Sequence, residues 1–227
     1  MHTGRMVLNA YDASAVEEAL VLTEAHGGEI DLILVGPESA SETIRKALAM
    51  GATRALHLRT SADTHFDSAA VSELLAKHLT GHEYDVIATG KQAQDTDAGL
   101  TGAMLAERLG LPYATNAVGL AREPGSLVVT RQGDVGEEVI ALPFPCLVTC
   151  SNDMNDPRIP KLKGIMQAKR KPVDTIDIDP AISGTATTRV LGFEPMPGRD
   201  PGMLLDGEPE EMAHALRQKL VEEARVL

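Results

Sequence analysis

Two spacings of apolar residues alternate along the first two-thirds of the chain. Segments with an apolar residue every three or four positions predict amphipathic helices, and short runs rich in Val, Ile and Leu predict buried strands. The helical spacing occurs in residues 12–26, 39–50, 67–79 and 98–109. The short apolar runs are residues 30–35, 55–58 and 84–89. This alternation predicts an α/β fold with a doubly wound, mostly parallel sheet and helices on both of its faces.

Capping residues predict where several of these helices begin. Ser14 with Glu17, and Ser39 with Glu42, have the Ser-x-x-Glu spacing of a capping box. Asp67 precedes the third helix and can accept a bond from a free N–H of its first turn. We therefore expect helix starts close to these side chains.

The pattern changes after the fourth helix. Four short β segments follow, joined by turn signals such as Glu-Pro-Gly, and we expect two of them to pair as a hairpin at the sheet edge. These segments are residues 117–122, 127–131, 137–142 and 146–150. From residue 151 the alternation stops, and an amphipathic helix is predicted after Asp206. We expect an α/β nucleotide-binding domain over residues 1–150, then an extended arm and terminal helix over 151–227.

Composition narrows the functional classes. The 227 residues include 33 acidic and 21 basic side chains, a formal net charge of -12, with three Tyr, three Phe and no Trp. A nucleic-acid partner is not expected, because phosphates call for Lys and Arg and bases call for aromatic platforms. Membrane insertion is not expected either, since no apolar run approaches the roughly 20 residues of a span. The first residues lack the apolar core of a signal peptide, which favours a cytoplasmic location.

Motifs for catalysis or metal binding are absent from the sequence. It contains no GxGxxG, P-loop, GxSxG or HExxH pattern. Asp95 and Asp97 lack a third ligand nearby, and His57 is expected to be a surface histidine. Cys146 and Cys150 are not in CxxC spacing and are expected to be buried small hydrophobes. We expect no metal site and no catalytic residue.

One loop has the character of a phosphate site. Residues 90–99, GKQAQDTDAG, follow the strand at 84–89 and lead into a helix that is expected to start near Ala98. Ligands of open parallel sheets lie beyond the carboxyl ends of the strands, and a helix N-terminus offers free N–H groups to an anion. The alternative is a solvated loop in which Asp97 only caps the helix.

Residues 158–171 form a basic segment inside an acidic chain. They include Lys and Arg but no Asp or Glu, with Leu162, Ile165 and Met166 interleaved. The segment is either an ordinary solvated charged stretch or a docking segment, in which apolar anchors make contact and basic charge steers an acidic partner. Prolines on both sides favour an extended conformation over a helix.

Several stretches of the sequence resemble the β subunit of electron transfer flavoprotein. They are NAYDASAVEEALVL from Asn9, SETIRKALAMGATRALHL from Ser41, GKQAQDTDAGLTGAMLAERLG from Gly90, VTRQGDVGEEVIALPFPCLVT from Val129 and NDPRIPKLKGIMQAKRK from Asn155. The resemblance implies a Rossmann-like sheet of the adenine nucleotide α-hydrolase-like kind. It further implies a heterodimer whose α subunit holds most of an FAD. Such a carrier has no independent turnover, accepts electrons from flavoprotein dehydrogenases such as acyl-CoA dehydrogenases, and passes them to a quinone reductase.

The resemblance also assigns residues. AMP is implied as a structural ligand, or a second FAD in electron-bifurcating members, and Tyr11 matches an aromatic residue near the flavin of the α subunit. The cofactor-binding positions are Asn9, Ala10, Tyr11, Asp12, Val35, Gly36, Gly90, Lys91, Gln92, Ala93, Asp95, Asp97, Ala98, Gly99, Leu100 and Thr101. The partner-docking positions are Arg158, Leu162, Ile165 and Met166, and those of the α-subunit contact are Arg131 and Gln132.

Three departures from the family pattern bear on these expectations. The strand and hairpin that the family places before the Asn9 segment are missing, and we expect that they were lost by truncation. Leu100 replaces an amide-bearing residue, which would weaken AMP binding. Gln132 replaces a Glu that holds an Arg of the flavin domain. The alternative functions are a bifurcating subunit and a stand-alone, stress-type adenine-nucleotide binder.

Overall fold

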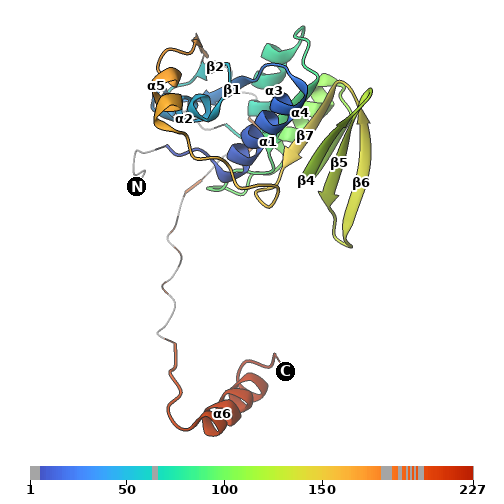
Figure 1. Cartoon of the computed structure of the whole chain (residues 1–227). Coiled ribbons are helices and arrows are strands. Elements are labelled where there is room, and N and C mark those ends of the chain that lie inside the picture. The colour runs from blue at the N-terminus through green and yellow to red at the C-terminus, as the bar shows by residue number, and fades with distance from the viewer. Residues whose placement is uncertain are drawn as a thin grey trace. The chain divides into compact units, whose positions relative to one another are not determined.

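The computed structural model describes residues 6–62, 66–179, 186–188, 191, 192, 194, 196, 198 and 202–226 (Figure 1). Met1–Arg189 form one compact unit and Val190–Leu227 a second. The helices are α1 (Ala10–His26), α2 (Ser41–Met50), α3 (Ser68–Leu79), α4 (Thr101–Leu109), α5 (Leu162–Ala168) and α6 (Pro209–Glu222). The strands are β1 (Asp31–Gly36), β2 (Arg54–Arg59), β3 (Val86–Gly90), β4 (Tyr113–Glu123), β5 (Ser126–Gln132), β6 (Glu137–Pro143), β7 (Cys146–Cys150) and β8 (Val173–Asp177).

The strands of the first unit form two sheets. One has the order β1-β2-β8 and is parallel throughout. The other has the order β3-β7-β4-β5-β6, in which β3, β7 and β4 are parallel and β4, β5 and β6 are antiparallel. Helices alternate with the parallel strands, because two parallel strands are joined by a long crossover connection, usually a helix. The predicted α/β class is confirmed, and so is a hairpin at the sheet edge.

The main hydrophobic core is centred on β7. All five residues of this strand are buried, because α1 and α4 cover its two faces and β3 and β4 flank its edges. Leu127 and Val129 of β5 and Ala15 of α1 belong to the same cluster. Cys146 and Cys150 are buried free thiols, as expected, and burial raises the pKa of Cys146 to about 11 and that of Cys150 to about 12.

β1 and β3 are end strands of their sheets. Along β3 every residue is only half-buried, and along β1 every residue except Gly36 is half-buried. Ile33 of β1 and Ile87 of β3 pack against one shared cluster. The Tyr84 hydroxyl, just before β3, donates to Asp31 Oδ2 at 3.1 Å. Side chains therefore join the two sheets. Within the described ranges no strand precedes Asn9, where the resembled family has one.

Two of the three predicted helix caps are wrong. α1 begins at Ala10, so Ser14 lies buried inside the helix, where its hydroxyl cannot reach the first-turn N–H groups. A 3-10 turn over Glu38–Ala40 precedes α2, and no side chain caps that helix. Asp67 does cap α3, because its Oδ1 accepts from the Ala70 N–H at 2.9 Å.

The part of the chain from residue 151 to residue 189 also belongs to the first unit. α5 lies on α2 (Figure 1). β8 pairs in parallel with β2. The expected extended conformation of the basic segment is wrong over Leu162–Ala168, since Pro160 precedes the helix and interrupts none of its hydrogen bonds. The compact unit extends to Arg189, beyond the expected boundary at residue 150. In the second unit, the helix predicted after Asp206 is present as α6.

Candidate functional site

The carboxyl end of β3 lies directly against the first turn of α1. The Gly90 N–H donates to Asp12 Oδ1 at 2.7 Å. A Cβ atom at Gly90 would lie 2.8 Å from the Asp12 backbone nitrogen and 2.9 Å from the Tyr11 Cβ. Glycine is therefore needed where these two backbones meet.

Asn9 joins the start of α1 to the loop that follows β3. Its side-chain amide donates to Asp12 Oδ2 and to the Gln92 carbonyl, both at 2.8 Å. The Asn9 Oδ1 atom is buried and has no hydrogen-bond partner. The Lys91 ammonium lies 5.9 Å from the centre of the Tyr11 ring. The structure thus brings together two predicted groups of site residues that are far apart in the sequence, and leaves a buried acceptor that a ligand N–H or O–H could satisfy.

The loop over residues 91–100 is held by its own hydrogen bonds. The Asp97 N–H donates to the Ala93 carbonyl at 2.9 Å, and the Ala93 N–H donates to the Ala98 carbonyl at 3.1 Å. Asp97 has a φ of 54° and accepts from Gln92 Nε2 at 3.0 Å. α4 begins at Thr101, later than expected, and no side chain caps it. The alternative in which Asp97 caps α4 is therefore wrong, and the first N–H groups of α4 are available to a ligand.

The other predicted cofactor positions differ in exposure. Residues 94–100 are exposed, and Leu100 is 60% exposed. Val35 and Gly36 end β1, in the other sheet, where the Gly36 carbonyl accepts from the Thr60 N–H at 3.0 Å and lies 3.0 Å from His57 Nε2. His57 is 2% exposed, so its expected surface position is wrong: β2 turns this side chain inward.

A second candidate surface is formed by α5. Three predicted docking residues are exposed apolar side chains on this helix: Leu162 (74%), Ile165 (45%) and Met166 (62%). The opposite side of α5 packs closely on α2, since Ala168 is buried and a Cβ at Gly164 would lie 2.6 Å from the Ala49 carbonyl oxygen. The large side chains of α5 therefore face solvent, while its small residues make the internal contact.

The C-terminal ends of α5 and α2 are joined by two cations. Arg45 of α2 donates from Nη1 to the carbonyls of Ala168 at 2.6 Å and of Lys171 at 2.8 Å. The Lys171 ammonium donates in return to carbonyls at the end of α2, and burial lowers its pKa. Those carbonyls belong to Leu48 (3.0 Å), Gly51 (3.2 Å) and Ala52 (2.6 Å). Positive charge at both helix C-termini also complements their dipoles.

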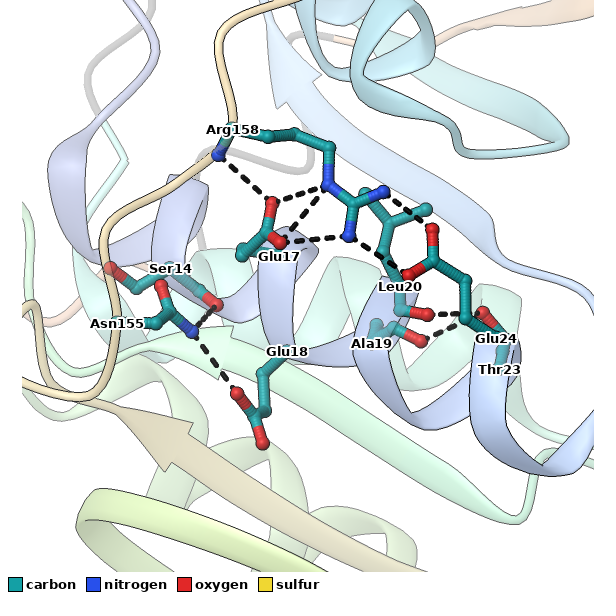
Figure 2. A network of polar contacts seen from close by, with 9 residues as sticks. All are labelled: Ser14, Glu17, Glu18, Ala19, Leu20, Thr23, Glu24, Asn155 and Arg158. Atoms are coloured by element: carbon teal, nitrogen blue, oxygen red, sulfur yellow. Dashed lines mark hydrogen bonds and ion pairs between the residues drawn. The ribbon is translucent and has the colours of Figure 1, made fainter.

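The fourth predicted docking residue, Arg158, faces the protein. Figure 2 shows its guanidinium between Glu17 and Glu24, two carboxylates of α1. Nε and Nη2 each lie 2.8 Å from a Glu17 oxygen, and Nη2 lies 3.2 Å from Glu24 Oε2. The bonds from Arg158 lower the pKa of both carboxyl groups.

The two predicted α-subunit contacts lie at the end of β5. The Arg131 guanidinium donates to the Thr115 carbonyl at 3.0 Å and to Glu138 Oε2 at 2.9 Å, which ties β5 to its neighbours β4 and β6. Gln132 is exposed, and its backbone carbonyl accepts from Asn116 Nδ2 at 2.8 Å. The described residues contain no cluster of three His, Cys, Asp or Glu side chains suited to a metal ion, and no helix among them is long and apolar enough to cross a membrane.

The family model of the electron transfer flavoprotein domain matches residues 1–181. The chain belongs to the electron transfer flavoprotein β subunit family. It is 38% identical over 227 residues to "Electron transfer flavoprotein subunit beta" of Bradyrhizobium diazoefficiens, covering 98% of this chain and 88% of the relative. It is 35% identical over 227 residues to the protein of that name from Bacillus subtilis, covering 97% of this chain and 88% of the relative.

A further relative has a different name. The chain is 34% identical over 226 residues to "Caffeyl-CoA reductase-Etf complex subunit CarD" of Acetobacterium woodii, covering 95% of this chain and 86% of the relative. These electron transfer flavoprotein relatives confirm the resemblance read from the sequence motifs and identify electron transport as the process in which the family acts.

Sequence reasoning missed several residues that hold these sites in place. Arg45 and Glu24 were not singled out, and Glu17 was assigned to a helix cap. Glu17 and Glu24 are separated by seven positions, two turns of one helix face, and this spacing was the available signal. Nothing in the spacing of Arg45 indicated its contact with the carbonyl of Ala168.

Proposed function

We propose that this chain is the β subunit of a heterodimeric, cytoplasmic electron transfer flavoprotein without turnover of its own. Its α subunit would hold most of an FAD and contact this chain near Arg131 and Gln132. Electrons would come from flavoprotein dehydrogenases, such as acyl-CoA dehydrogenases, and leave to a quinone reductase. The proposal rests on family membership over nearly the whole chain. The scarcity of aromatic side chains agrees with it, since the resemblance to the family implies only one ring of this chain, Tyr11, near a flavin.

We further propose AMP as a structural ligand of the site between α1 and the loop after β3. The unpartnered Oδ1 of Asn9 and the uncapped N-terminus of α4 fit a nucleotide, because one offers an acceptor and the other offers N–H groups to a phosphate. Lys91 adds a positive charge beside them. AMP would bind and orient the loop, and no electron-transfer step involves it. The exposed Leu100 side chain offers no hydrogen bond there.

A second candidate ligand for the same site is FAD, as in a bifurcating complex. It is favoured by one observation, the relative named as a subunit of a caffeyl-CoA reductase-Etf complex. The two candidates differ in flavin stoichiometry, so one measurement separates them.

Co-expression with an α subunit tests the proposal. We expect a stable yellow complex from which one FAD and one AMP per heterodimer are extracted and identified by mass spectrometry. Two FAD molecules per heterodimer would instead favour the bifurcating alternative, in which FAD takes the place of AMP. A chain that binds AMP or ATP alone and never forms a flavin-containing complex would contradict the proposal and favour a stand-alone nucleotide binder.

The docking role of α5 is tested by Leu162→Ala in that complex. The substitution removes an exposed side chain, so folding and flavin content should stay unchanged, while docking of the donor dehydrogenase should weaken by about 1–3 kcal/mol. Electron transfer at limiting donor measures the loss. Val21→Ala, at a 44% exposed position of α1, is the control. Equal rates for the two variants would overturn the docking assignment.

A further inference from the structure

Arg158 makes every one of its observed side-chain bonds to α1. Nε, Nη1 and Nη2 all bond to Glu17 or Glu24, and the backbone N–H of Arg158 donates to Glu17 Oε2 at 3.0 Å (Figure 2). A cation that met an acidic partner directly would present a free edge of its guanidinium. The Arg158 guanidinium instead bonds within the protein, and Arg158 lies just before the exposed apolar residues of α5.

The neighbouring residue Asn155 binds the same helix. Its Nδ2 donates to the Ser14 carbonyl at 3.2 Å and to Glu18 Oε2 at 3.1 Å. The segment over residues 155–158 therefore lies along successive turns of α1, from Ser14 to Glu24, as Figure 2 shows. The Glu17 side chain is 10% exposed, so Arg158 also compensates a carboxylate that is largely withdrawn from water.

α5 depends on such anchors because it is short. It has seven residues, and no side chain caps its N-terminus at Lys161. A helix of this length is not stable by itself in water. Its C-terminal end is held by Arg45, which donates to the Ala168 carbonyl. Arg158 and Asn155 supply the corresponding attachment ahead of its N-terminal end.

We propose that Arg158 is a positioning residue, which fixes the start of the α5 segment on α1 and thereby holds Leu162, Ile165 and Met166 ready for a partner flavoprotein. This inference rests on the docking function proposed for α5. Its physical basis is preorganisation: a surface that is already ordered loses less conformational entropy on binding. Arginine suits the task because its planar fork engages two carboxylates at once, which an ammonium cannot do with the same geometry.

The test uses the complex with the α subunit and an acyl-CoA dehydrogenase as donor. We compare Arg158→Gln, Arg158→Lys, Glu24→Gln and Leu162→Ala for the KM of the donor, kcat, flavin content and amide exchange of residues 159–168. Arg54→Gln is the matched control, because Arg54 makes a comparable two-bond pair with Asp31, at 2.7 and 2.8 Å, between β1 and β2. Glu24→Gln and Arg158→Lys keep the experiment decisive if Arg158→Gln folds poorly, since Glu24 is 59% exposed and the lysine retains the charge.

We expect Arg158→Gln to raise the KM of the donor about tenfold, with kcat and flavin content unchanged. A tenfold rise corresponds to a variant in which about one molecule in ten has the segment ordered for binding. Exchange over residues 159–168 should become faster, Arg158→Lys should restore part of the affinity, and Glu24→Gln should raise the KM about twofold. A merely structural role would instead lower flavin content and accelerate exchange throughout the chain.

Two further results would overturn the inference, and they are distinguishable. If Leu162→Ala raises the KM but Arg158→Gln, Arg158→Lys and Glu24→Gln all match Arg54→Gln, α5 docks the partner without help from Arg158. If Leu162→Ala also leaves the KM unchanged, the docking function itself fails and the inference fails with it.

Discussion

The loop over residues 91–100 and the segment over residues 155–171 serve the two proposed binding functions, and they are held by different interactions. The loop is held by close backbone contacts and short-range bonds, with Gly90 pressed against Asp12. The segment is joined to α1 and α2 by three cations: Arg158 and Lys171 of the segment, and Arg45 of α2. The first arrangement leaves no space for an added atom at Gly90, whereas the second depends on charged side chains, among them Glu17 and Glu24, whose carboxyl groups titrate. The two regions should therefore fail under different perturbations.

The largest effect is expected for Gly90→Ala. The added methyl group would lie 2.8 Å from the Asp12 backbone nitrogen and its Oδ1, so one of the two backbones must move. We expect the free energy of unfolding to fall by about 1–3 kcal/mol, the range of overpacking substitutions, measured by denaturant titration. Gly99→Ala, in the loop that follows Gly90, is the control, because its nearest contacts are at 3.5 Å and beyond. Equal stability of the two variants would show that the loop adapts to the added atom.

A smaller effect is expected for Lys171→Met in the other region. The substitution removes the ammonium that bonds three carbonyls at the end of α2, while the aliphatic stem is retained. We expect a loss of about 1–2 kcal/mol in the free energy of unfolding, since bonds from a charged donor are replaced by none. Lys169→Met changes an exposed lysine of the same segment and should cost less than about 0.5 kcal/mol. If both variants lost a similar free energy of unfolding, the effect would come from the change in net charge and not from the three bonds of Lys171.

The smallest effect is expected from acid. Arg158 holds the pKa of Glu17 and Glu24 below their ordinary value of 4.5, so the folded state binds their protons less readily than the unfolded state. Their stabilisation is complete above pH 4.5 and is lost as pH falls through the lowered pKa values. The stability difference between wild type and Arg158→Gln should be constant above that pH and narrow below it.

Glu18 provides an internal check on the sign of that titration. Burial raises the pKa of this carboxyl group, so its contribution to stability changes with pH in the opposite direction. Glu18 is common to wild type and Arg158→Gln, and its effect should largely cancel in the difference. A difference that widened on acidification would contradict the assignment of Glu17 and Glu24 as the titrating partners.

The local sequence pattern was enough to predict a helix or strand where that element's own residues determine its conformation. The strands β1, β2 and β3 and the helix α3 with its Asp67 cap were predicted, because periodicity and capping act within a few positions. β8 was missed, since Val173–Asp177 carries acidic residues and is a strand through its pairing with β2. α5 was missed because its seven residues are helical in contact with α2.

The same division holds for the candidate site. The motifs around Asn9 and Gly90 identified the family and grouped the loop with the start of α1, although they could not show the unpartnered Asn9 Oδ1. Leu162, which the sequence predicts as an apolar anchor for a partner, is exposed in the structure, and its docking role stays a prediction. The predicted docking role of Arg158 came from the family resemblance and from its place in a basic segment, and neither indicates which acidic residues the fold brings near it.

By itself, the sequence determined the fold class, the family and the two segments on which function was proposed, because these follow from residue order and local spacing. Only the tertiary structure decided how the segments are held. Arg158 and Glu17 are 141 positions apart, and Arg45 and Lys171 are 126 positions apart. Contacts at such separation depend on the packing of α1 and α2 against the rest of the unit. No local pattern in the chain encodes which carboxylate or carbonyl a given cation will meet.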